Sequence, residues 1–106
     1  MRFTVILVPG DEGWVSAMVP AMPGCVSQGR TRDEALDNAR EAMEGWIELE
    51  AARGSGPLPE TPALVLDGVS AAIQIIDDMR AAGELNAASG YNLELATVEL
   101  RQPIAA

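Results

Sequence analysis

Few residues of this 106-residue chain have side chains suited to catalysis. Histidine is absent, which excludes imidazole acid–base catalysis, Ser–His and Cys–His nucleophiles and imidazole metal ligands. Adjacent acids occur at Asp11–Glu12 and Asp77–Asp78, and a metal-dependent nuclease can be built from carboxylates alone. Adjacent side chains diverge on a strand or helix, however, and neither predicted N-terminal strand contains an acid that a rigid sheet would aim. We therefore predict no catalytic residue, no metal ligand and no cofactor. An all-carboxylate hydrolase is the least supported hypothesis for the function of this chain.

The single cysteine, Cys25, is the other candidate for chemistry. It cannot form a disulfide within the chain, and the chain has no lysine or histidine to lower the pKa of its thiol. We predict that Cys25 is a small buried packing residue and not a reactive thiol.

The charge of the chain limits its possible partners. Sixteen acids stand against seven arginines, giving a net charge of −9. Nucleic-acid affinity comes largely from Lys and Arg that neutralise phosphates, so direct binding of DNA or RNA is not expected. An acidic protein suits a basic protein partner better. No stretch approaches eighteen apolar residues, and we expect a soluble, cytoplasmic protein with no membrane association.

The first thirty residues predict three strands joined by turns. Residues 2–8 are rich in β-branched and large apolar side chains and end at Pro-Gly. Residues 14–19 are the predicted antiparallel partner. Pro20 and Pro23 lack amide donors and must leave the ladder, and Gly24 allows the turn into a third strand over 25–28.

A helix is predicted from about Arg32 to Arg53, because Thr31 and Glu34 form a capping box. One face of this helix is apolar and includes Trp46. The other tryptophan, Trp14, lies beside a loop and is expected to be the more exposed of the two. The opposite face carries a row of acids with two possible roles, a solvated surface or a docking surface for a basic partner. Its members are Asp37, Glu41, Glu44 and Glu48.

The second half predicts an extension of the same domain. A proline-rich connector over 57–62 is the best internal boundary. A short strand over 63–66, a helix from 69 or 70 to 82, and a strand over 91–101 with a bulge near Leu95 are expected after it. We therefore divide the domain into a βββα core (1–60) and a β-α-β extension (61–106). Arg80 and Arg101 are the only bases after residue 62, so the extension is not predicted to bind DNA.

Two spaced motifs resemble the HicB antitoxin family over residues 3–59. One is Pro-x-x-Pro-Gly-Cys and the other is Gly-x-Thr-x-x-Glu-Ala-x-x-Asn. These structural motif residues are Pro20, Pro23, Gly24, Cys25, Gly29, Thr31, Glu34, Ala35 and Asn38.

The resemblance implies an α+β fold, namely a degenerate ribonuclease-H-like βββαβ domain, here with a C-terminal helix and strand extension. It also implies a protein without enzyme activity that binds a small basic HicA-type toxin, masks its RNA-binding surface and forms a homodimer or higher homo-oligomer. A stand-alone oligomeric scaffold without a toxin is the alternative function. The candidate partner contacts are Asp11, Glu12, Trp14, Asp37, Glu41, Glu44 and Glu48.

Overall fold

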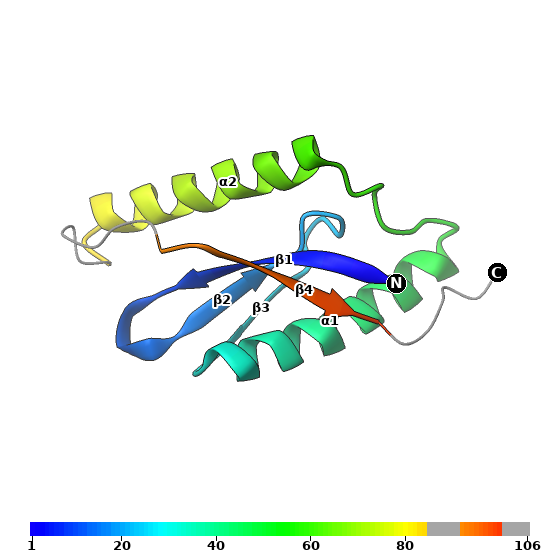
Figure 1. The fold of residues 1–106 in the computed structure, drawn as a ribbon, viewed down its shortest axis with the longest axis horizontal. Coiled ribbons are helices and arrows are strands. Elements are labelled where there is room, and N and C mark those ends of the chain that lie inside the picture. The colour runs from blue at the N-terminus through cyan, green and yellow to red at the C-terminus, as the bar shows by residue number, and fades with distance from the viewer. Residues whose placement is uncertain (85–91, 101–106) are drawn as a thin grey trace.

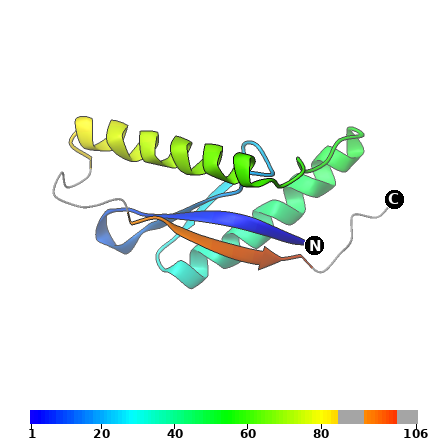
Figure 2. The same cartoon turned by 45° about the horizontal axis from the view of Figure 1, so that its top comes forward.

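The fold is a four-stranded antiparallel sheet with a helix on each face (Figure 1). The structure, a computed structural model, describes residues 1–84 and 92–100, without the side chain of Asp11. The strands stand in the order β3-β2-β1-β4, and the turned view of Figure 2 shows the two helices on opposite sides of them. The elements are β1 (Arg2–Pro9), a 3₁₀ turn (Asp11–Gly13), β2 (Val15–Met18), β3 (Val26–Gly29), α1 (Arg32–Ala52), α2 (Pro62–Ala81) and β4 (Glu94–Glu99). The α+β class is therefore confirmed.

The predicted meander of three strands is present. Leu7 pairs with Ala17 across β1 and β2, and Ala17 pairs with Ser27 across β2 and β3. Glu12 and Gly13 close the β1–β2 turn with positive φ angles of 59° and 84°. Two successive left-handed residues turn the chain tightly, and the glycine adopts that geometry without steric cost.

Strand β1 is apolar on both faces because both faces are covered. On the α1 side, Leu7 packs with Ala39 and Met43 in the larger core cluster. On the α2 side, Ile6 packs with Ala72 in a smaller cluster. Side chains alternate across a strand, so a central strand between two helices must be hydrophobic at successive positions.

The strand predicted over 63–66 is wrong, because these residues lie in α2, which begins at Pro62. Thr61 caps this helix, its hydroxyl accepting a hydrogen bond from the Leu64 amide at 3.1 Å. Proline at the first helical position has a suitable fixed φ and lacks only an amide that would have no intrahelical partner. Thr61 and Pro62 therefore mark the start of the helix, which begins seven residues before the predicted Val69.

The bulge predicted near Leu95 is also wrong. Within the described strand, the register runs without interruption through Ile6↔Leu95 and Val5↔Ala96. Leu93 packs on the α2 side, whereas Ala96 belongs to the α1-side cluster. The change of phase in the sequence reflects a strand with apolar contacts on both faces. The outermost predicted residues, 91 and 101, lie outside the described residues.

The connector between the helices is tied to the sheet beyond the end of β2. Thr4 donates its backbone amide to Glu60 Oε1 at 2.7 Å and its hydroxyl to Glu60 Oε2 at 3.0 Å. Strand β2 pairs with β1 only from Ile6 onward, which leaves the Thr4 amide without a strand partner on that side. The Glu60 carboxylate therefore completes the hydrogen bonding of β1 and fixes where α2 starts.

Candidate partner-binding site

The candidate surface is built on α1, and Gly29 determines how closely α1 approaches the sheet. A Cβ atom at Gly29 would lie 2.7 Å from the Glu34 carbonyl carbon and 2.9 Å from Ala35 Cα. These distances are far inside ordinary carbon–carbon contact. The glycine of the second motif is thus a site of direct contact between β3 and the first turn of α1, where Ala35 is fully buried.

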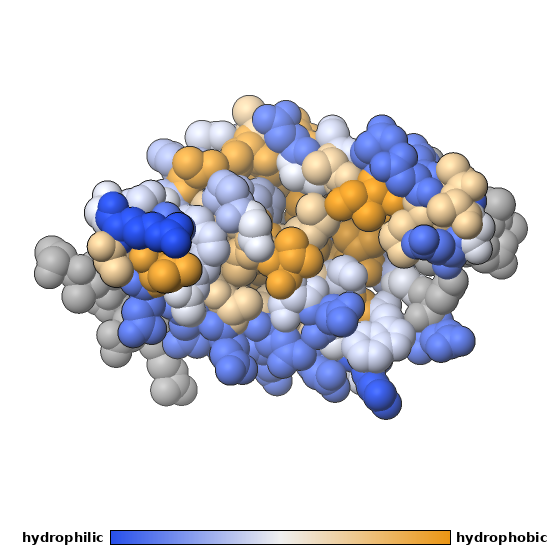
Figure 3. Space-filling model, turned by 180° about the vertical axis from the view of Figure 1, so that it is seen from behind, coloured by the Kyte–Doolittle hydropathy of each residue, from blue (hydrophilic) through white to orange (hydrophobic). Residues whose placement is uncertain are grey.

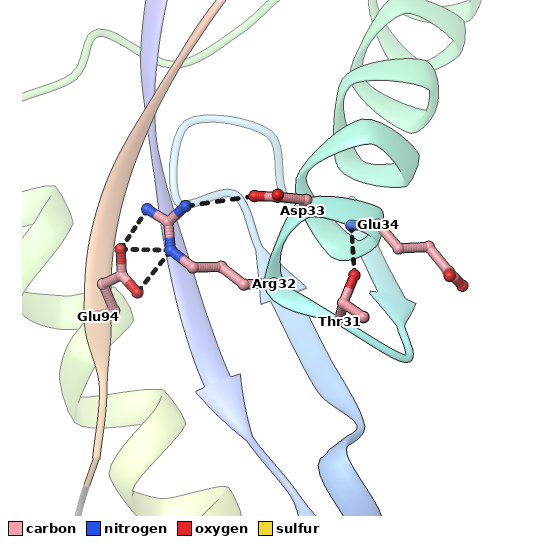
Figure 4. A network of polar contacts seen from close by, with 5 residues as sticks. All are labelled: Thr31, Arg32, Asp33, Glu34 and Glu94. Carbon is pink, nitrogen blue, oxygen red and sulfur yellow. Dashed lines mark hydrogen bonds and ion pairs between the residues drawn. The ribbon is translucent and has the colours of Figure 1, made fainter.

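The N-terminus of α1 is capped nearly as predicted (Figure 4). The Thr31 hydroxyl accepts a hydrogen bond from the Glu34 amide at 3.0 Å. The Glu34 carboxylate accepts one from the amide of Arg30, not of Thr31, at 3.3 Å. The hydrogen bond from the backbone to the Glu34 carboxylate therefore comes from the residue before the N-cap, and it links the loop before α1 to the helix.

The Pro-x-x-Pro-Gly-Cys motif forms a tight loop between β2 and β3. Gly24 has a φ of 84°, and the Val19 amide donates to the Cys25 carbonyl at 3.2 Å. Trp46 donates its indole N–H to the Pro23 carbonyl at 3.0 Å, so the loop is held by α1. Pro20 contacts the other helix, because a Cβ at Gly68 of α2 would lie only 3.0 Å from its Cγ.

Asn38 and Cys25, the remaining polar members of the motifs, also have structural roles. Asn38 donates its side-chain amide to the Gln28 carbonyl on edge strand β3 at 2.8 Å. Cys25 is 6% exposed, and burial raises the pKa of its thiol. These contacts support the prediction that Cys25 packs in the core and does not react.

The acidic row lies on the face of α1 that points away from the sheet. All four carboxylates are exposed, and the ion pairs found among the described residues involve other acids. The row extends from residue 37 to residue 48, which is roughly 16 Å at the helical rise. Figure 3 shows hydrophilic side chains gathered along the side of the molecule that α1 forms. The row comprises Asp37, Glu41, Glu44 and Glu48.

The other predicted contacts lie at the β1–β2 turn. Trp14 is 39% exposed, as expected, and the Arg30 guanidinium carbon lies 5.4 Å from the centroid of its ring. This cation–π contact joins the β1–β2 turn to the loop that starts α1. Glu12 is exposed on the same turn. The Asp11 side chain lies outside the described part of the structure.

Sequence reasoning did not identify Arg30 or Arg32. The strand register supplies the missing signal for Arg30, because Val15 pairs with Gly29 and the next residues outward are Trp14 and Arg30. Arg32 donates from Nε to both carboxylate oxygens of Glu94 at 2.9 Å (Figure 4). This bond lowers the pKa of the Glu94 carboxyl and raises that of Arg32. Helix α1 is thereby attached to β4, a contact between residues too distant in sequence to predict from a local pattern.

Nowhere in 1–84 or 92–100 do three or more acidic or cysteine side chains gather closely enough to hold a metal ion. Within the same ranges, no helix is both long enough and apolar enough to cross a bilayer.

A sequence model described as the HicB-like antitoxin of bacterial toxin–antitoxin systems matches residues 3–87. The chain belongs to this family. The match extends well beyond residue 59, where the resemblance in the sequence motifs ended, and includes α2. Membership in the HicB-like family indicates an antitoxin role in a toxin–antitoxin system and suggests a role other than catalysis.

Relatives in sequence are short archaeal and bacterial proteins. A UPF0150 protein of Thermoplasma acidophilum is 46% identical over 48 residues, which are 45% of this chain and 70% of the relative. A UPF0150 protein of Archaeoglobus fulgidus is 30% identical over 50 residues, which are 47% of this chain and 72% of the relative. The shared segment is about as long as the βββα core.

Two solved structures share the fold of this HicB-like protein. The N-terminal domain of the Burkholderia pseudomallei antitoxin HicB matches with a TM-score of 0.53 and 26% identity, over 94% of this chain and all of that chain. A chain of a HicA3 and HicB3 toxin–antitoxin complex matches with a TM-score of 0.58 and 24% identity, over 96% and 100%. At that identity, the second likeness concerns the fold alone.

Proposed function

We propose that this HicB-like chain binds a small basic HicA-type toxin through the exposed face of α1 and neutralises it by masking its RNA-binding surface. The observation that supports this assignment is the row of four exposed carboxylates on α1, with no ion-pair partner among the described residues. An RNA-binding surface is cationic, so a complementary acidic face both attracts it and excludes the substrate.

Trp14, which contacts Arg30 just before the start of α1, is the proposed apolar anchor. Tryptophan is enriched among the residues that contribute most to binding at protein interfaces. Arg30 holds the ring through its cation–π contact, so less side-chain freedom would be lost on binding. The complex would form in the cytoplasm, as a homodimer or higher homo-oligomer of this chain with the toxin, and without direct contact between this chain and nucleic acid.

The test is binding to the basic toxin-like protein encoded by the adjacent reading frame. Glu41→Gln/Glu44→Gln should slow association several-fold and weaken its dependence on salt, because both charges steer the encounter. Trp14→Ala should raise the Kd roughly 30-fold, the effect of losing one interface tryptophan.

A double variant on the α2 side provides the matched control. Asp67→Asn/Glu84→Gln changes the net charge by the same amount at two exposed positions, and association should remain close to that of the wild type. If this control slows association as much as the α1 variant does, the toxin does not dock on α1. If no basic neighbour binds or loses its RNA cleavage, the antitoxin assignment fails and the stand-alone scaffold is favoured.

A further inference from the structure

The two edges of the sheet are protected to different degrees. Edge strand β3 lies against the first turn of α1 at Gly29, and Asn38 occupies the Gln28 carbonyl. Edge strand β4 has no hydrogen bond on its outer side to any described residue. An unpaired edge is a template for another strand, and proteins usually cover or blunt such edges. The backbone groups on the outer side of β4 are therefore available, among the described residues, for hydrogen bonds to another strand.

The hydrogen-bonding groups on this edge follow from the β1–β4 register. The first residue and Leu100 exchange both backbone bonds, at 2.7 Å and 3.1 Å. Antiparallel pairs alternate between bonded and non-bonded, so every second residue of β4 turns its amide and carbonyl away from β1. The outward-pointing residues are Leu95, Thr97 and Glu99.

We propose that the outer edge of β4 pairs with β4 of a second copy of this chain, antiparallel and centred on Thr97. In this register, Leu95 lies opposite Glu99 of the second copy, and Thr97 lies opposite its own equivalent. No acid faces an acid across the new pair, and like charges directly opposite are what destabilise such pairs. The edge is thus complementary to itself, as a twofold interface requires.

Charge also favours this edge in a chain of net charge −9. The Glu94 carboxylate is bound by Arg32, and Glu99 lies 3.7 Å from Arg2 and 3.8 Å from the ammonium of Met1. Both acids of β4 are therefore compensated locally. The uncompensated row on α1 lies elsewhere, so two acidic copies can approach at β4 with little repulsion.

The same geometry would place the two α2 helices on the same face of one continuous sheet. Three strand spacings would separate the two β1 strands by about 14 Å, which is wider than the 8–10 Å at which helices pack, so strand pairing alone does not bring the two α2 helices into contact. Leu95, which is 55% exposed in the single copy, would be partly covered by the Glu99 side chain opposite it.

The experiment is sedimentation equilibrium of the full chain with paired variants. Thr97→Pro removes an amide that points away from β1, so the existing sheet is kept and the two central bonds of the new pair are lost. The dimer Kd should rise roughly 100-fold. Thr97→Lys places two like charges opposite each other and should give a monomer. Thr97→Val, and Gln28→Lys on edge β3, should dimerise as the wild type does.

Hydrogen exchange provides a second readout that needs no variant. The amides of Leu95, Thr97 and Glu99 should become protected as the wild-type concentration rises through the dimer Kd. A wild type that is monomeric throughout, a dimer that survives both Thr97→Pro and Thr97→Lys, or a dimer lost only in Gln28→Lys would overturn the proposal. Thr97→Lys should still bind the toxin, so failure of this interface is distinct from failure of the proposed function.

Discussion

The substitution Gly29→Ala tests whether direct backbone contact positions α1. The added Cβ would lie 2.7 Å from the Glu34 carbonyl carbon and 2.9 Å from Ala35 Cα. Carbon atoms in contact are normally 3.5–4.0 Å apart, so the helix would have to move by about 1 Å. The obstructing atoms are backbone atoms held by the Thr31 cap, and no flexible side chain can rotate away.

The expected magnitude follows from two opposing terms. Overpacking of a well-ordered site costs about 1–3 kcal/mol, while alanine recovers about 0.5–1 kcal/mol of the conformational entropy that glycine loses in a strand. Because the obstructing atoms are backbone atoms, the overpacking cost should lie near the upper end of its range. After the entropy gain is subtracted, the free energy of unfolding should fall by about 2 kcal/mol. For a domain of this size, that loss lowers Tm by roughly 10 °C.

Gly45→Ala is the matched control, since it makes the same chemical change inside α1. A Cβ at Gly45 meets no atom within 4 Å, and alanine is favoured over glycine in an exposed helix by about 1 kcal/mol. This variant should therefore be more stable than the wild type. Urea unfolding with an unchanged m-value would measure both shifts. If Gly29→Ala lies within about 0.5 kcal/mol of the wild type, the close approach of α1 to β3 does not constrain this position.

Two further predictions concern titratable groups. The pKa of Glu94 is lowered by its bond to Arg32, so the stability advantage of the wild type over Glu94→Gln should be full at pH 7, well above the ordinary pKa of 4.5. Urea unfolding should show that advantage fading as the pH falls through the lowered pKa, and an advantage that persists in acid would contradict the Arg32 contact. Cys25, with a raised pKa and 6% exposure, should react with a thiol reagent only after unfolding; rapid labelling of the native protein, followed by absorbance, would show that the Pro-Gly loop opens.

Local patterns in the sequence predicted the N-terminal half well. The meander depends on prolines and a glycine at fixed positions, and the start of α1 depends on the Thr31–Glu34 pair. Both are short-range signals whose physical cause lies within a few residues. The exposed row of acids on α1 was predictable for the same reason, because helical periodicity alone puts those residues on one face.

The second half was harder to predict because its signals were ambiguous. Ala63–Leu66 is a short apolar run, which periodicity cannot assign to a strand or a helix. The Thr61 cap and Pro62 decided the matter in favour of a helix. The change of phase near Leu95 had two explanations, a bulge or a strand with apolar contacts on both faces, and only the position of α2 on the sheet distinguished them.

The sequence by itself determined the family, the acidic surface and the absence of histidine chemistry, because these follow from residue identity and local spacing. Only the tertiary structure decided that Arg32 binds Glu94, that Arg30 lies over Trp14, and that β3 and β4 form the two edges of the described sheet. Each of these pairings joins segments brought together by packing of the sheet and helices. Contacts of this kind depend on how the elements pack, which no local pattern of residues specifies.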